Sequence, residues 1–171
     1  MPDDSLNNSF EEAKLKAMRV LSYGSKSKDA LYDKLLDADF TNDAAAAAVA
    51  CMEELGYIND ERMALDYVAY AVESKAFGRA RIVNDLCRKG ISESIAEAAY
   101  DKYEQDRRAE PNSFDFELQN AVQILQKRLR QLGLDADDLD YGDYRRLKGF
   151  LHRRGFDFDL IDKAFKELKE D

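Results

Sequence analysis

The spacing of apolar residues predicts a helical chain in which one pattern occurs three times. Each copy has a helix-start residue, two apolar residues four positions apart, a short break and a second cap. Because residues four apart share one face of a helix, the apolar pairs are predicted core positions. The start residues and pairs are Ser27, Leu31 and Leu35, then Gly78, Ile82 and Leu86, then Asp143, Leu147 and Leu151, with second caps at Thr41, Ser92 and Asp157.

Each copy is preceded by a longer helical pattern and followed by a shorter amphipathic one. The longer patterns cover residues 10–23, 59–74 and 114–132, and Ser9 with Glu12 has capping-box spacing ahead of the first. We therefore predict an all-α fold of three tandem three-helix repeats, with modules at 1–56, 57–108 and 109–171. The third module carries an acidic insertion between helices. Repeats that bury one face against the next form an elongated, curved array with an extended binding surface.

Composition supports a packed helical protein outside the membrane. Of the 171 residues, 45% are hydrophobic and 36% are charged, which provides apolar material for a core and many solvated faces. No run approaches the ~18 apolar residues that span a bilayer, and the acidic start differs from a secretory signal. We expect a cytoplasmic monomer. Cys51 and Cys87 lie far apart on faces that look apolar, so we expect two buried, reduced thiols.

Residues for catalysis or metal binding are scarce. His152 is the single histidine, and its basic flank suggests a surface helix position. The acidic run 135–140 lacks the Gly and Glu of an EF-hand, since those slots hold Asp140 and Arg146, and is better explained as a solvated linker. The chain also has no GxxxxGK[ST] loop. We expect no enzymatic activity, no metal and no cofactor.

Positive charge is concentrated in two of the three middle helices, although the formal net charge is −9. One interpretation is that these side chains are solvated faces paired with neighbouring acids. The other is a directional partner-binding surface, because the basic groups recur at equivalent repeat positions and could meet DNA phosphates or an acidic protein surface. The candidate residues are Arg79, Arg81, Arg88 and Lys89 in module two, and Arg145, Arg146, Arg153 and Arg154 in module three.

Several segments resemble the RecX family of bacterial regulators of the RecA recombinase. The stretch Gly56-Tyr57-Ile58-Asn59-Asp60, followed by Met63-Ala64, is similar to a family motif, and the likeness runs from about Ala13 to Leu168. Residues 27–35, 78–91 and 151–156 resemble signatures of the first, second and third modules in that order. Ala76 and Asp39 depart from the pattern by standing where relatives often have glycine.

The resemblance implies a regulator, mainly an inhibitor, that binds along the RecA filament on single-stranded DNA. Such a protein would lower ATP hydrolysis, strand exchange and filament assembly by RecA, in DNA repair, recombination and the SOS response. We expect direct contact with DNA to be weak, because the net negative charge opposes a phosphate backbone. The alternative is an autonomous helical DNA-binding protein that uses the basic middle helices of modules two and three.

Overall fold

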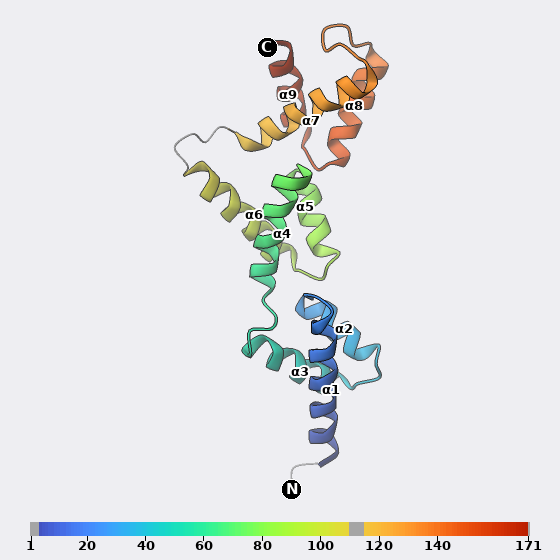
Figure 1. Cartoon of the computed structure of the whole chain (residues 1–171), viewed down its shortest axis with the longest axis vertical. Helices are drawn as coiled ribbons and strands as arrows, with labels where there is room; N and C mark the ends of the chain where they lie inside the picture. Colours follow the sequence, from blue (N-terminus) through green and yellow to red (C-terminus); the bar gives the residue numbers. More distant parts are fainter. Residues whose placement is uncertain (1–3, 110–114, 171) are drawn as a thin grey trace. The chain divides into compact units, whose positions relative to one another are not determined.

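The computed structural model describes residues 4–109 and 115–170, with side chains from Ser9 onward. In this part of the chain every regular element is an α-helix, which confirms the predicted all-α fold (Figure 1). The helices are α1 (Asp4–Ser22), α2 (Lys28–Leu36), α3 (Asn42–Glu54), α4 (Asp60–Lys75), α5 (Arg79–Cys87), α6 (Glu93–Arg108), α7 (Phe116–Leu132), α8 (Tyr141–Arg153) and α9 (Phe158–Glu170). None of these described helices combines the length and the apolar character needed to cross a bilayer.

Side-chain caps explain where most of the shorter helices begin. Ser27 Oγ accepts a hydrogen bond from the Ala30 amide at 3.2 Å, and Thr41 Oγ1 accepts one from the Ala44 amide at 3.3 Å, as predicted. The predicted start of α8 was wrong. Asp140 is its cap, because the Asp140 carboxylate accepts a hydrogen bond from the Asp143 amide at 2.7 Å, so the last residue of the acidic run belongs to a helix start.

The longer helices also begin at other residues than predicted. Helix α1 starts at Asp4, so Ser9 lies inside it and the capping-box prediction was wrong. Its predicted partner Glu12 lies in the same helix and is exposed. Helix α7 starts at Phe116 after Asp115, whose carboxylate accepts a hydrogen bond from the Leu118 amide at 3.2 Å. The predicted start at Phe114 lies outside the described residues.

The described helices form two compact units, each with its own buried apolar residues. The first contains the residues up to Ala64 together with Leu86–Ala96, and the second contains Leu65–Asp85 together with the residues from Glu97. In the first unit α1 packs against α2 and α3, and in the second α7 packs against α8 and α9. The predicted core residues Leu31, Leu35, Ile82, Leu86, Leu147 and Leu151 are all at most 1% exposed. The module boundaries after residues 56 and 108 stay predictions.

In the first unit, hydrogen bonds fasten the start of α2 to later parts of the chain. Ser27 Oγ donates to the Lys89 carbonyl at 2.6 Å. The Lys28 amide donates to Asp60 Oδ1 at 3.1 Å, and Asp60 is buried, which raises the pKa of its carboxyl. The first amides of a helix have no partner within the helix, so these contacts satisfy groups that would otherwise need water.

The second unit repeats this arrangement at the start of α5. The Gly78 amide donates to the Arg154 carbonyl at 2.8 Å, and the Arg79 amide donates to Glu117 Oε1 at 3.2 Å. A Cβ atom at Gly78 would lie 2.5 Å from the Gly155 carbonyl oxygen, so the two chain segments touch through their backbones. Only glycine allows this approach, and it brings α5 directly against the end of α8.

Two residues without the freedom of glycine have left-handed backbone conformations. They are Asp39, with φ of 63°, and Ala76, with φ of 46°, and both stand where the resemblance places glycine in relatives. Each follows a helix end, where glycine commonly takes this conformation. Ala76 therefore carries strain between its Cβ atom and the backbone.

The predicted burial of the two cysteines was wrong. Cys51 is partly exposed and Cys87 is exposed, and both are free cysteines in the structure. Cys87 is the last residue of α5 and lines a cavity of about 450 Å³ in the first unit, so its side chain is open to solvent although Leu86 is buried beside it.

We expect Ala76→Gly to raise the free energy of unfolding by about 0.5–1 kcal/mol, because the relief of left-handed strain exceeds the added entropy of the unfolded chain. Urea unfolding followed by circular dichroism measures this change. Ala47→Gly, on the exposed face in the middle of α3, is the matched control and should lower the same quantity by about 0.5–1 kcal/mol. A loss of stability in both variants would contradict the strain at Ala76.

We expect Glu117→Gln to change how stability depends on pH. Burial raises the pKa of Glu117, while the hydrogen bond from the Arg79 amide opposes the rise. A carboxyl with a raised folded pKa stabilises the fold below its unfolded pKa of about 4.3 and loses that contribution as pH rises through the folded pKa.

The Gln variant keeps an oxygen for the Arg79 amide but does not titrate. The stability of the variant relative to the wild type should therefore increase with pH across this window and then stay constant. Urea unfolding at a series of pH values measures it, with the exposed Glu167→Gln as the control for loss of one charge. A difference that falls with pH would show that the carboxylate is stabilised by the fold.

Candidate partner-binding surface

The basic residues predicted to bind a partner lie in different environments in the structure. Arg79 has a structural role. Its Nε donates to Glu97 at 2.8 Å and its Nη2 lies 2.7 Å from Asp101. The guanidinium also lies 5.1 Å from the ring centroid of the buried Tyr100. Two carboxylates and an aromatic ring thus occupy Arg79, so little of its charge is directed toward a partner.

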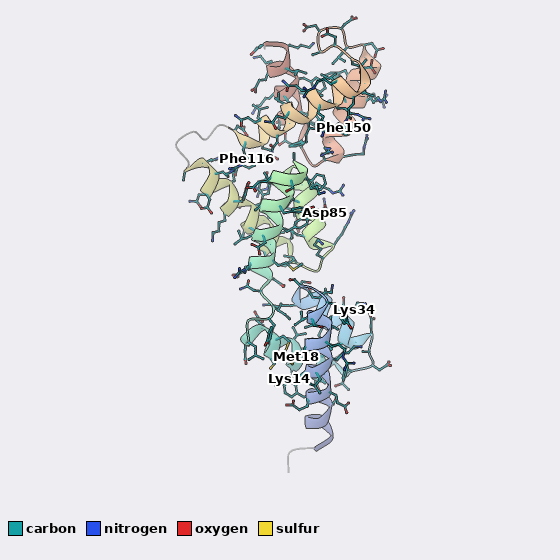
Figure 2. All side chains as sticks on the ribbon, viewed as in Figure 1. Lys14, Met18, Lys34, Asp85, Phe116 and Phe150 are labelled. Carbon is teal, nitrogen blue, oxygen red and sulfur yellow. The ribbon has the colours of Figure 1, made fainter. Side chains whose placement is uncertain are left out.

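Arg81 is also paired within the second unit. Its Nε donates to Asp85 at 2.8 Å, one helical turn away, and Tyr67 donates a hydrogen bond to the same carboxylate at 3.2 Å. Figure 2 labels Asp85 among the side chains of this unit. Its guanidinium lies 5.1 Å from the ring centroid of Phe77. The first interpretation of the basic helices, pairing with neighbouring acids, therefore describes the start of α5.

Arg88 and Lys89 lie at the end of α5 beside charges of both signs. Both side chains are exposed and line the cavity of about 450 Å³ in the first unit. The same cavity is lined by Lys26 and by the carboxylates of Asp29 and Asp33. This mixture makes the cavity a weak attractor for an anion, since the carboxylates offset the field of the cations.

Three arginines of α8 form an exposed basic face. Arg145, Arg146 and Arg153 are all exposed, and no ion pair with them occurs in the segments 4–109 and 115–170. Arg146 and Arg153 are seven positions apart, so they lie about 20° apart around the helix axis. On the same helix, Lys148 is paired with Asp162 at 2.5 Å. We call Arg145, Arg146 and Arg153 the α8 basic face.

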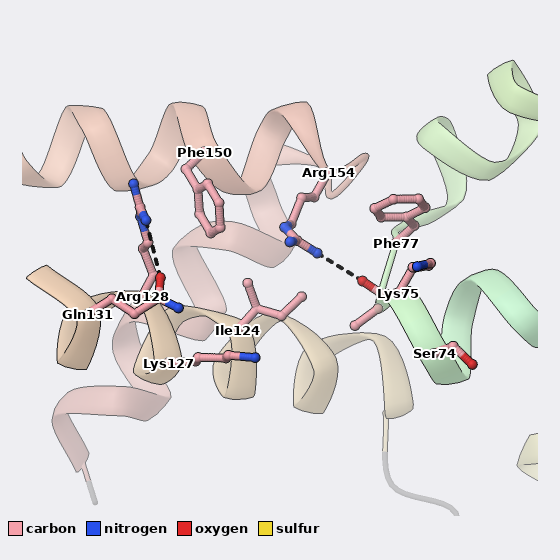
Figure 3. A pocket seen from close by; sticks show the side chains of 10 residues that line it. Ser74, Lys75, Phe77, Ile124, Lys127, Arg128, Gln131, Phe150 and Arg154 are labelled. Carbon is pink, nitrogen blue, oxygen red and sulfur yellow. Dashed lines mark hydrogen bonds between the residues drawn. The ribbon is translucent and has the colours of Figure 1, made fainter.

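Arg154, just after α8, has a different position from its neighbour Arg153. Its Nη1 donates to the Lys75 carbonyl at 2.8 Å, and its guanidinium lies 5.8 Å from the ring centroid of Phe77 and 5.2 Å from that of Phe150 (Figure 3). Partial burial and the nearby charge of Arg81 lower the pKa of Arg154. This side chain is directed into the second unit.

Arg154 lines a cavity together with three cations that were not predicted from the sequence: Lys75, Lys127 and Arg128. Lys75 ends α4, and Lys127 and Arg128 lie on α7. The sequence did not point to them, because the repeated basic residues lie in the middle helices and these three lie on α4 and α7. The adjacent pair Lys127-Arg128 within a long helical pattern was the available signal.

His152 is exposed as predicted and stacks on Phe158, with ring centroids 4.4 Å apart. Within the described residues there is no group of three or more His, Cys, Asp or Glu side chains that could hold a metal ion. The arrangement can bind anionic groups by charge and hydrogen bonding.

Comparisons with known proteins identify the family. The family model for the second three-helix domain of RecX matches residues 59–99, and that for the third matches residues 115–165. The chain is 30% identical to the regulatory protein RecX of Legionella pneumophila (strain Corby) over 154 residues, which cover 90% of this chain and 92% of that protein. This chain belongs to the RecX family.

Other RecX proteins show the same likeness. RecX of Trichlorobacter lovleyi is 30% identical over 161 residues, which cover 94% of this chain and 98% of that protein. The crystal structure of RecX from Lactobacillus salivarius superposes with a TM-score of 0.79 at 23% identity and covers 96% of this chain and 99% of that one. The resemblance seen in the sequence is confirmed, and the solved structure shows the same fold.

Replacing an arginine by methionine should lower the stability of this RecX protein at a structural arginine and leave it nearly unchanged at a surface arginine. We expect Arg79→Met to lower the free energy of unfolding by about 1–2 kcal/mol, because Glu97 and Asp101 lose their partner at a partly exposed site. Arg145→Met should change it by less than about 0.5 kcal/mol. Urea unfolding of both variants under one buffer condition measures the contrast. Equal losses would mean that the α8 basic face also stabilises the fold.

Proposed function

We propose that this chain regulates the RecA recombinase by binding along the RecA filament on single-stranded DNA. In this proposal it lowers ATP hydrolysis, strand exchange and filament assembly by occupying the filament, and it has no catalytic activity of its own. Membership of the RecX family and the name regulatory protein RecX of its relatives support this function. We propose that it acts in the cytoplasm as a monomer.

The exposure of the α8 basic face supports its role as the surface that contacts the filament. Arg145, Arg146 and Arg153 are exposed, and no described carboxylate pairs with them, whereas Arg79 and Arg81 are occupied by acids. Charged groups of this kind steer association and select complementary partners. We therefore propose that this face, rather than the start of α5, meets an acidic surface of the filament.

Repetition supports binding to a filament rather than to a single subunit. A filament presents the same protomer surface at regular intervals, and linked modules gain avidity when each can engage a copy. We propose that the modules 1–56, 57–108 and 109–171 contact successive parts of the filament in this manner. Arg88 and Lys89 lie at the module-two position equivalent to Arg153 and Arg154, and we include them as weaker contacts.

Autonomous DNA binding is the second candidate, and the unpaired charges of the α8 basic face are the observation that favours it. The net charge of −9 opposes approach to a polyanion, so this activity should be weak at physiological salt. A protein filament can present a local acidic surface without the long-range repulsion of a naked phosphate backbone. The filament is therefore the better-supported partner.

We expect the purified chain to lower the DNA-dependent ATPase of RecA in a steady-state assay. The triple reversal Arg145→Glu, Arg146→Glu and Arg153→Glu should raise the concentration needed for half inhibition by about tenfold or more, because the favourable field at the contact becomes repulsive. The matched control reverses three exposed lysines of α9, namely Lys163→Glu, Lys166→Glu and Lys169→Glu.

Unchanged RecA turnover at saturating wild-type protein would refute the proposed function. Full inhibition by the α8 reversal variant would leave the function in place but refute the contact face. A loss of inhibition that is equal in the α8 and α9 variants would show that only net charge matters.

A further inference from the structure

A cavity of about 390 Å³ in the second unit collects positive charge from three chain segments (Figure 3). Its charged lining residues are Lys75 at the end of α4, Lys127 and Arg128 on α7, and Arg154 after α8. Among the residues that the structure describes, no acidic side chain lines it, although the chain has 35 acidic and 26 basic residues. The cavity in the first unit differs, because it contains carboxylates beside its cations.

The arginines of the cavity are held in place before any ligand arrives. Arg154 donates to the Lys75 carbonyl at 2.8 Å and lies between the rings of Phe77 and Phe150. Arg128 donates to Gln131 Oε1 at 3.2 Å, and its guanidinium lies 5.2 Å from the ring centroid of Phe150 (Figure 3). A fixed guanidinium loses less entropy when it binds an anion.

These contacts leave the positive charge uncompensated. The partners of Arg154 and Arg128 are a carbonyl, an amide oxygen and phenyl rings, none of which carries a formal charge. Partial burial and repulsion from Arg81 lower the pKa of Arg154, in line with a cation that has no anionic partner. An anion entering the cavity would offset this repulsion.

The geometry favours phosphate over other anions. Arg and Lys side chains that converge from several directions suit tetrahedral phosphate groups, whose oxygens point to several sides, whereas a carboxylate presents two oxygens in one plane. The faces of Phe77 and Phe150 are occupied by the guanidinium groups of Arg81, Arg128 and Arg154, so they do not serve as stacking platforms for bases. Recognition would depend on phosphate and not on base identity.

We propose that this cavity is a phosphate-binding site, whose ligand is either a phosphate of a single-stranded nucleic acid or a free oligophosphate. The site is distinct from the α8 basic face, and its two guanidinium groups are preorganised rather than freely mobile. It would give the chain a point attachment to phosphate that a strongly negative protein otherwise lacks.

Isothermal titration calorimetry of the full chain with inorganic tripolyphosphate at low salt tests the proposal, without RecA present. We expect one site, and binding at least about tenfold weaker in the double variant Lys127→Gln, Arg128→Gln, since two charge-assisted contacts are lost. Lys163→Gln with Lys169→Gln, on the exposed surface of α9, removes the same charge and should change affinity less than about twofold. Arg154→Gln provides a second test if the double variant is poorly folded.

Competition identifies the source of the phosphate. Displacement of tripolyphosphate by an oligo-dT strand would assign the site to a nucleic acid backbone, whereas independent binding would assign it to a free oligophosphate. Absence of tripolyphosphate binding, equal binding by the cavity and α9 variants, or tighter binding of an oligoglutamate peptide would overturn the proposal. Because RecA is absent, these outcomes do not bear on the proposed regulation of RecA.

Discussion

The backbone amides at the start of α2 and of α5 are the constraint on which the contacts between distant segments within each unit depend. A helix cannot satisfy its own first amides, so the chain must supply acceptors from elsewhere. In the first unit the Lys28 amide is bound by the buried Asp60, and in the second the Arg79 amide is bound by Glu117. A carboxylate from a later helix, α4 for α2 and α7 for α5, thus caps the start of the helix in both units, so the contact is a repeated feature and not a chance one.

This constraint also determines which cations are available to a partner. The backbone contact between Gly78 and the Arg154 carbonyl places α5 against the end of α8. Arg79 then lies beside Glu97 and Asp101, and the side chain of Arg154 enters the space near the end of α4. The α8 basic face remains exposed, although its residue Arg153 directly precedes Arg154 in the sequence. Lys89 and Arg154 hold equivalent positions in the repeat, but Lys89 is exposed whereas Arg154 is partly buried. Equivalent residues can therefore have different roles.

Much of the fold could be predicted because it depends on local patterns. Apolar pairs such as Leu31 with Leu35 and caps such as Thr41 depend on helical spacing alone, and the structure places them as expected. Asp140 could not be separated from Asp143 as the cap of α8, since both are acidic and only the backbone geometry decides between them. The cavity was missed for a different reason. Lys75, Lys127 and Arg154 line one cavity although they come from the end of α4, from α7 and from the residue after α8, and no spacing along the chain records that proximity.

The two sets of cations differ in the kind of binding they can support. Exposed arginines on α8 act through a field that salt screens over about 10 Å, so they mainly affect the rate at which a partner approaches. The two arginines of the cavity, Arg128 and Arg154, are held by neutral contacts and are partly buried, so a bound anion would be held more firmly and would dissociate more slowly. Under the two proposals, a protein with a net charge of −9 meets an acidic partner surface through the α8 basic face and holds phosphate in the cavity, without the general affinity for nucleic acid that a uniformly basic protein would have.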